Sequence, residues 1–369
     1  MAEIRKSRLT SFNWILFGLI LFITAIGLLT LYSATGSGTG PAEGMPLYVK
    51  QLLWLALGVV VLAALLFIDY RVIEHYGYLI YGLTLLMLVY VLVFGRSISG
   101  ARRWIDAGPL QFQPSEFVKL SFILALAKFF HNRDHPEHYT VLRLRVPILF
   151  FCVTFVLVLL EPDLGTAMIL SLVFFSMVLF VGLKKSNLVA LILVGILAVP
   201  AGWHVLRDYQ RERILTLLYP SRDPLGSGYH INQSKIAIGS GKLLGRGFLR
   251  GTQTRLRFIP EQHTDFIFSV LAEEWGFLGS LVVLVSYALL LFWGLDVARN
   301  AKDTFAMLTA LGVTCLLFWH VSINIGMGMG LLPVVGVPLP LLSYGGSFLV
   351  VTFAGIGLLI NIHMRRFMF

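Results

Sequence analysis

Long apolar runs recur along the whole chain and alternate with short polar connections. A helix needs about 20 residues to cross the hydrocarbon of a bilayer, and it satisfies its own backbone hydrogen bonds while doing so. The runs predict about ten membrane-spanning helices, at residues 12–33, 48–68, 76–94, 115–130, 146–160, 164–183, 187–205, 266–296, 304–329 and 341–363. We therefore predict an all-α polytopic membrane protein, a single domain over residues 1–369 with one large extracytoplasmic loop at 206–264.

Composition supports this class, because 57% of the residues are hydrophobic, 13% are charged and the mean hydropathy is +0.82. Such values exclude an ordinary water-soluble domain. The two cysteines, Cys152 and Cys315, lie in separate apolar runs, which argues against a disulfide framework or a thiolate metal site. We interpret both as packing residues.

Basic residues in the short connections predict the orientation, because positively charged short loops stay in the cytoplasm. Lysine and arginine gather before the first span, near 133–145, 184–185 and 299–302, and after the last span. The opposite short connections, near 34–47, 161–163 and 330–340, contain neither residue. An even number of spans then predicts that both termini are cytoplasmic.

The large loop is outside yet rich in lysine and arginine, and long loops escape the orientation rule. Two interpretations remain open. The loop could be a solvated segment lying against anionic lipid, or it could form an electropositive surface for an anionic substrate at the outer leaflet. Its glycine-rich part, "DPLGSGYHINQSKIAIGSGKLLGRGFLRG", predicts tight turns and close backbone approach.

Three ionisable clusters stand at the outer ends of different spans, where they are hypotheses for a functional site. Glu116 and Lys119 share one helix face at the start of the fourth span. Asp163 precedes the sixth span, and Asp265 precedes the eighth. Each has a plainer interpretation: a local ion pair for the first cluster, a helix cap for Asp163, and a cap by Thr264 with a first-turn acid for the third. Three clusters at one side favour a shared pocket.

A carboxylate, a lysine and a basic loop at the outer leaflet suit one kind of chemistry in particular. A carboxylate can accept the proton of a hydroxyl nucleophile, and cationic side chains can neutralise a phosphate leaving group. Together they fit glycosyl transfer from a lipid-pyrophosphate sugar. The same groups could also bind an anionic lipid without reaction or form a proton relay in a transporter, and composition does not separate these functions.

Specific motifs run from one end of the chain to the other. They are "GARRWIDAGPLQFQPSEFVKL" at 100–120, "EPDLGTA" at 161–167, "DPLGSGYHINQSKIAIGSGKLLGRG" at 223–247, "PEQHTDFIFSVLAEEWGFLG" at 260–279 and "LPVVGVPLPLLSYGGS" at 332–347. With them the chain resembles the SEDS family (shape, elongation, division and sporulation). The "VVGVPLP" stretch is closer to its rod-shape branch, RodA, than to its division branch, FtsW.

The resemblance implies a peptidoglycan glycosyltransferase in the cytoplasmic (inner) membrane, which polymerises lipid II at the outer face during cell elongation. It implies that Asp265 is the general base. The implied substrate-binding residues, some of which would hold the pyrophosphate, are Glu116, Lys119, Arg103, Gln113, Ser115, Asp163, His263 and Lys242. A divalent cation, Mg²⁺ or Mn²⁺, could share that task.

The implied partners are lipid II, a class B penicillin-binding protein and other membrane proteins of the elongation complex, with no nucleic acid. The glycine-rich stretch "INIGMGMGLL" at 323–332 is a hypothesis for the surface that contacts the partner's membrane helix. Two alternative functions remain, a lipid II flippase and a non-catalytic scaffold of the wall-synthesis complex. The gathering of ionisable groups at the outer end argues against a translocation path.

Overall fold

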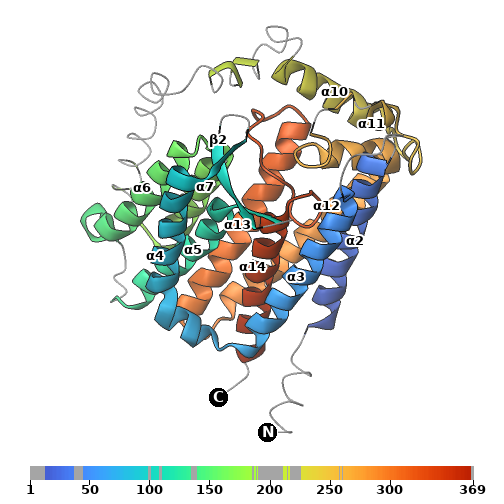
Figure 1. Cartoon of the computed structure of the whole chain (residues 1–369). Helices are drawn as coiled ribbons and strands as arrows, with labels where there is room; N and C mark the ends of the chain where they lie inside the picture. The colour runs from blue at the N-terminus through green and yellow to red at the C-terminus, as the bar shows by residue number, and fades with distance from the viewer. Residues whose placement is uncertain are drawn as a thin grey trace.

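The protein is a bundle of long helices that run between two opposite ends of the molecule (Figure 1). The computed structural model describes residues 13–36, 45–98, 101–107, 110–133, 139–184, 187, 189, 211–213, 215–216, 226–256, 258–259 and 261–366. Over this part of the chain, eight helices are long and apolar enough to cross a membrane. The predicted all-α polytopic class is confirmed.

In the described part of the chain, nine long helices correspond to predicted spans. They are α2 (Trp14–Gly36), α3 (Leu47–Phe67), α4 (Tyr70–Phe94), α5 (Pro114–His131), α6 (Arg145–Leu160), α7 (Leu164–Val181), α12 (Ile267–Arg299), α13 (Thr304–Gly328) and α14 (Gly346–Arg365). Of these, α5 is not among the eight candidate membrane spans, and it carries the charged residues Glu116, Lys119 and Lys128. The predicted span at 187–205 lies outside the described residues apart from positions 187 and 189.

Two boundaries differ from the prediction by five residues or more. Helix α4 begins six residues before the predicted start at 76, because the Asp69 side chain accepts a hydrogen bond from the Arg71 N–H and caps the helix there. Helix α14 begins at Gly346 rather than at 341. The preceding residues 331–345, which we call the 331–345 segment, are apolar but irregular, so their hydropathy resembled that of a span.

Three short strands and two short helices lie at one end of the bundle in the described part of the chain. A small antiparallel sheet of β1 (Arg96–Ile98), β2 (Ala101–Ala107) and β3 (Leu110–Phe112) follows α4, in the order β1-β2-β3. This sheet was not predicted from the sequence. The described part of the large loop contains α10 (Ser227–Ser240) and α11 (Thr252–Arg255), both at the same end as the sheet (Figure 1).

The opposite end gathers the connections between α3 and α4 and between α12 and α13, together with the end of α14. Arg365 on α14 forms an ion pair with Asp69 at 2.8 Å. The Tyr70 hydroxyl donates to the Asp303 carboxylate at 2.6 Å. The long helices thus alternate in direction as the predicted spans require.

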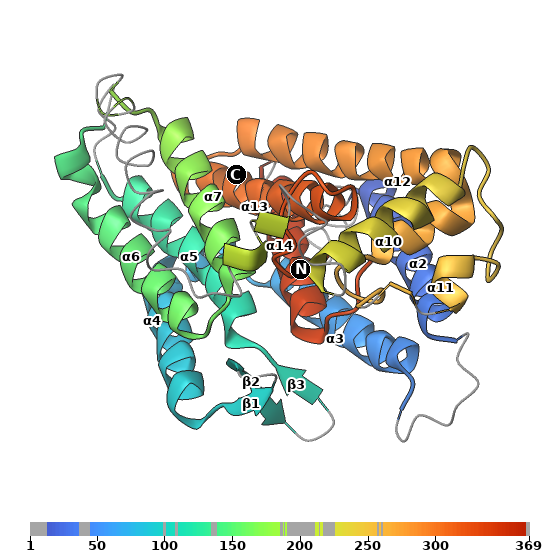
Figure 2. The same cartoon turned by 90° about the horizontal axis from the view of Figure 1, so that it is seen from above.

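Helix α14 lies in the middle of the bundle in both views (Figures 1 and 2). All residues in the apolar 18-residue stretch of α14 are buried inside the protein (100%), whereas only 22% are buried in the corresponding stretches of α3, α4 and α6. Large apolar side chains on those outer helices remain exposed, for example Leu57, Leu86 and Val156. An apolar outer face with a buried central helix is the arrangement expected of a protein whose solvent is lipid.

Helix α12 is interrupted at Gly276, which has φ 68° and ψ −162°. Such a conformation suits glycine, and it frees the backbone groups on either side of the kink. The loop 242–247 satisfies them: the N–H groups of residues 246 and 247 donate to the carbonyls of 273 and 274 at 3.0 and 2.9 Å, and those of 277 and 278 donate to the carbonyls of 242 and 243 at 2.9 and 3.1 Å. The kink is therefore a fixed junction with the large loop.

Candidate active site

A cavity of about 320 Å³ lies among elements at the end of the bundle that carries the sheet. Its walls come from segments far apart in the sequence: β2, the first turns of α5 and α7, the turn before α12, the middle of α13 and residues 336–348. The polar and charged residues that line it include Arg103, Gln113, Glu116, Lys119, Asp163, Glu261, Thr264, Asp265, His320, Tyr344 and Ser347. The three clusters that the sequence placed at separate helix ends share this one cavity.

Helix α5 brings Glu116 and Lys119 to the cavity. Pro114 occupies its first turn, where the missing N–H is not needed, and the two residues then project from one face. Lys119 Nζ lies 2.8 Å from Glu116 Oε2, and the residues are only 2% and 5% exposed. A charge buried this deeply is tolerated only when it is paired and hydrogen-bonded. The pair therefore places a fixed positive group beside the cavity.

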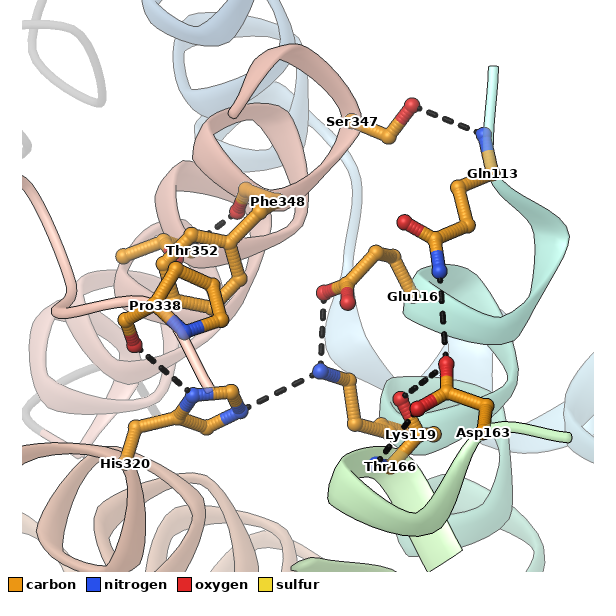
Figure 3. Close-up of polar contacts among 10 residues, drawn as sticks. All are labelled: Gln113, Glu116, Lys119, Asp163, Thr166, His320, Pro338, Ser347, Phe348 and Thr352. Carbon is orange, nitrogen blue, oxygen red and sulfur yellow. Dashed lines mark hydrogen bonds and ion pairs between the residues drawn. The ribbon is translucent and has the colours of Figure 1, made fainter. Parts of the chain in front are cut away.

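His320 also lines the cavity and was not among the predicted site residues; it lies within the apolar run of α13. Its Nε2 lies 3.1 Å from Lys119 Nζ and its Nδ1 lies 3.2 Å from the carbonyl oxygen of Pro338; Figure 3 shows both contacts. An ionisable residue in the middle of a membrane span is itself a signal for a functional site. That signal was present in the sequence.

Asp163 stands at the start of α7 and faces α5. Its carboxylate accepts hydrogen bonds from the Thr166 N–H at 3.1 Å, from the Thr166 hydroxyl at 2.9 Å and from Gln113 Nε2 at 3.4 Å. The N–H of Gln113 in turn donates to the Ser347 hydroxyl at 3.0 Å. These contacts join α5, α7 and α14 along one wall of the cavity (Figure 3).

Arg103 reaches the cavity from β2 and fixes the turn between α6 and α7. Its Nε donates to the Glu161 carbonyl at 2.8 Å, and its Nη2 donates to the Pro162 carbonyl. The Glu161 side chain is buried; burial, then the neighbouring Asp163, raises the pKa of Glu161 to about 8. Arg103 thus ties β2 to the turn before α7 and also lines the cavity.

Asp265 lies in a turn, residues 261–266, just before α12. Its N–H donates to the Glu261 carbonyl at 3.1 Å, and its own carbonyl accepts from Asn324 Nδ2 at 3.0 Å. The side chain lines the cavity. Burial, then the negative charge of Glu261, raises the pKa of Asp265 to about 7. A carboxyl group with a pKa near neutrality can accept a proton and release it again at physiological pH.

The 331–345 segment holds this turn from the other side. The Ser343 hydroxyl donates to the Thr264 carbonyl at 2.6 Å, and the Tyr344 N–H donates to the His263 carbonyl at 2.9 Å. Asn324 Nδ2 also donates to the Val337 carbonyl at 2.7 Å. The backbone on both sides of Asp265 is therefore tied to α13 and to the 331–345 segment.

The structure decides among the plainer interpretations of the three clusters. Asp163 does cap α7 through its bond to the Thr166 N–H, although it also lines the cavity. Glu116 does form a local ion pair with Lys119. The expected cap by Thr264 is wrong, because α12 begins at 267 and Phe266 occupies the cap position without a side-chain hydrogen bond.

Three of the proposed substrate-binding residues do not line the cavity. Ser115 is fully buried in the first turn of α5. His263 lies in the same turn as Asp265, with Nε2 3.7 Å from the Glu261 carboxylate. Lys242 is exposed in the loop that joins the α12 kink. Arg246 and Arg255, in the described part of the large loop, are likewise exposed.

The glycine-rich stretch at 323–332, a hypothesis for the surface that contacts the partner's membrane helix, makes contacts within the protein itself. A Cβ on Gly326 would contact Leu332, and one on Gly328 would approach the hydroxyls of Ser269 and Ser234. These glycines therefore pack against the chain's own residues. Within the described ranges, no group of three His, Cys, Asp or Glu side chains lies close enough to hold a metal ion.

Comparison with known proteins adds a second line of evidence. A family model described as the FtsW/RodA/SpoVE cell cycle protein matches residues 13–367. Peptidoglycan glycosyltransferase MrdB of Escherichia coli is 42% identical over 350 residues, which cover 94% of this chain and 92% of the relative. Peptidoglycan glycosyltransferase RodA of Treponema pallidum is 32% identical over 430 residues, with 97% and 98% covered.

Solved structures agree over almost the whole chain. A protein from a study of the structural coordination of polymerization and crosslinking by a peptidoglycan synthase complex is 36% identical, with a TM-score of 0.82 and coverage of 97% of this chain and 99% of that one. The rod shape determining protein RodA of Thermus thermophilus is 33% identical, with a TM-score of 0.71 and coverage of 97% and 98%.

Proposed function

Because the chain belongs to the FtsW/RodA/SpoVE family of cell cycle proteins, we propose that its cavity is the active site of a peptidoglycan glycosyltransferase of cell elongation. The enzyme transfers glycan from lipid II, an undecaprenyl-pyrophosphate-linked disaccharide peptide, to a growing strand at the outer face of the cytoplasmic membrane. Relatives that align over nearly their full length carry this activity in their names.

One observation supports the assignment of the site: a single cavity brings together Asp265, Lys119 and Arg103, which lie in three distant parts of the sequence. Glycosyl transfer needs a base for the acceptor hydroxyl and positive charge for the leaving pyrophosphate. A volume of about 320 Å³ is at the lower end of the range for small-ligand pockets. The cavity therefore suits the reacting sugar and phosphate, with the peptide and the polyprenyl chain outside it.

In the proposed reaction, the Asp265 carboxylate accepts the proton of the 4-hydroxyl of the acceptor's N-acetylglucosamine. The hydroxyl oxygen forms a bond to C1 of the donor's N-acetylmuramic acid while the bond between C1 and the pyrophosphate oxygen breaks. Undecaprenyl pyrophosphate leaves with its negative charge facing Lys119 and Arg103. The raised pKa of Asp265, about 7, is suited to this proton transfer because a base works best when its pKa lies near the operating pH.

A divalent cation, Mg²⁺ or Mn²⁺, belongs to the proposal only as a counter-ion of the pyrophosphate. The carboxylates of Asp163 and Glu261 line the cavity and are of the ligand type that such ions prefer. The steps assigned to Asp265 and Lys119 do not depend on it.

The test is polymerisation by the purified protein in detergent. Lipid II should be converted into glycan strands that are visible on a gel after crosslinking is blocked. Failure to polymerise lipid II, both alone and with a class B penicillin-binding protein added, would contradict the proposal and favour a flippase or a scaffold.

The pH dependence of this assay should follow Asp265. Its pKa of about 7 is the pKa of a base that works when deprotonated, so activity should be lost as the pH falls through 7 and be full above it. The Glu261 charge raises the pKa of Asp265; hence Glu261→Gln should lower that pKa and move the loss of activity to lower pH. Glu74 lies near the beginning of α4, at the end of the bundle opposite the sheet. Glu74→Gln is therefore the matched charge-removing control and should leave the pH dependence of activity unchanged.

We also infer that both termini are cytoplasmic and that a class B penicillin-binding protein crosslinks the product. The chain has no Ser-x-x-Lys sequence, the nucleophile motif of penicillin-sensitive transpeptidases, and a structural neighbour comes from a complex that polymerises and crosslinks. Affinity purification after co-expression should recover both proteins and other membrane proteins of elongation. Recovery of this chain alone, with no stimulation on adding the partner, would refute the partnership.

A further inference from the structure

His320 makes two contacts that determine where its single ring proton lies. Lys119 has only donors on Nζ, so the His320 Nε2 that lies 3.1 Å from it must accept. The Pro338 carbonyl can only accept, so the His320 Nδ1 at 3.2 Å must donate. The contacts therefore specify one neutral tautomer, with a lone pair facing the ammonium and an N–H facing the backbone.

The same contacts leave Lys119 with one uncommitted donor. An ammonium group has three N–H bonds; Nζ forms an ion pair with Glu116 Oε2 at 2.8 Å on one side, and His320 Nε2 accepts a hydrogen bond on another. Nζ also lies 5.4 Å from the centre of the Phe348 ring, which narrows the space on that side. Figure 3 shows the ammonium held between Glu116 and His320. The third N–H remains for a ligand in the cavity that Lys119 lines.

His320 also holds the 331–345 segment in position through the Pro338 carbonyl. It stands about two turns before the end of α13, so the Pro338 carbonyl that it binds must lie below the outer end of that helix. Asn324, one turn further along α13, donates to the carbonyl of the preceding residue of the same segment, Val337. Unpaired carbonyls at this depth would be costly. The two side chains hold the 331–345 segment inside the bundle as a wall of the cavity.

We propose that His320 is a positioning residue that orients the Lys119 ammonium toward the substrate pyrophosphate and joins it to the wall of the cavity. The inference rests on the proposed function, in which Lys119 contacts that pyrophosphate. His320 itself needs no proton transfer for this role, because both of its ring nitrogens are already engaged. Its contribution is to binding geometry rather than to chemistry.

Glutamine is the decisive substitution at this position. Its side chain has a carbonyl oxygen that can accept from Lys119 and an amide that can donate to the Pro338 carbonyl, so His320→Gln preserves both contacts. His320→Leu removes both contacts and replaces the ring with an apolar side chain. Thr314→Val on the same helix is a matched control, because Thr314 donates only to the Ala310 carbonyl of its own helix.

Binding should be measured in an Asp265→Asn background, so that lipid II is not consumed. His320→Leu should weaken the binding of lipid II about tenfold or more, because a hydrogen bond to a charged group loses its alignment. His320→Gln and Thr314→Val should stay within about threefold of the parent. In the background with intact Asp265, the leucine variant should raise KM more than it lowers kcat.

Two results would overturn the proposal, and a third concerns the function it rests on. Equal binding by the leucine variant and the parent would remove the role, and equal defects in the leucine and glutamine variants would show that the two contacts are not what His320 supplies. If the leucine variant does not fold in detergent, His320→Asn replaces it, since asparagine is too short to span both partners. Unchanged binding in Lys119→Met would instead refute the proposed contact of Lys119 with the pyrophosphate.

Discussion

Replacing Asp265 with asparagine is expected to lower the rate of lipid II polymerisation by about 10² to 10⁴, the usual effect of losing a general base. Asparagine has the same shape but no basic oxygen. The backbone contacts of this residue, to Glu261 and Asn324, do not involve its side chain, so the turn before α12 should be retained. The rate is measured with purified protein at pH 8, where Asp265 is deprotonated.

Glu261→Gln is the matched control for this experiment, because it also removes a carboxylate that lines the cavity. It should retain polymerisation at pH 8. Thermal unfolding in detergent should give similar midpoints for both variants and the parent. Long glycan made by the Asp265→Asn variant at near the parental rate would mean that Asp265 only supports the turn.

Replacing Lys119 with methionine is expected to reduce polymerisation sharply, because methionine keeps much of the stem but deletes the ammonium that, in the proposed reaction, faces the leaving pyrophosphate. The substitution also removes the partner of Glu116, which is buried. Breaking a buried ion pair in this way costs about 3 to 5 kcal/mol. Loss of activity in this single variant could therefore reflect a weakened fold, and the measurement needs a second variant.

The double variant Glu116→Gln with Lys119→Met separates the two effects. It removes both charges, so no uncompensated carboxylate remains in the bundle, and its thermal stability should recover much of the loss. Polymerisation per folded molecule should stay low if the ammonium acts on the substrate. A stable and fully active double variant would show that the pair serves the fold alone.

Hydropathy predicted most helix boundaries closely because lipid imposes a simple requirement on the outer helices. A run such as Leu47–Phe67 is apolar along nearly all of its length, with Lys50 and Gln51 near its first end, because a spanning helix must be mainly apolar within the hydrocarbon. The 331–345 segment defeated the same argument. Its apolar side chains are buried in protein, and its backbone is satisfied by side chains such as Asn324 and Ser343, which no local pattern reveals.

The candidate site was predictable to the extent that its residues stand at helix ends. Glu116, Asp163 and Asp265 are polar residues beside apolar runs, and their common side followed from the alternation of spans. The partner of Lys119 was not predictable, since His320 lies 201 positions away. The kink at Gly276 was not predictable for a similar reason. Its free backbone groups form hydrogen bonds with the loop 242–247, and a glycine in the sequence does not indicate which segment will form them.

The central place of α14 has a consequence for how the protein is made. Among the described helices, α14 follows all others in the sequence, yet it is the one that the others surround. Helices enter the bilayer in the order of synthesis. The faces of the earlier helices that pack against α14 in the finished bundle therefore remain incompletely packed until α14 has been inserted. Residues up to Arg365 must leave the ribosome before those faces can close around their last member, and until then the half-made bundle is a natural substrate for membrane chaperones and proteases.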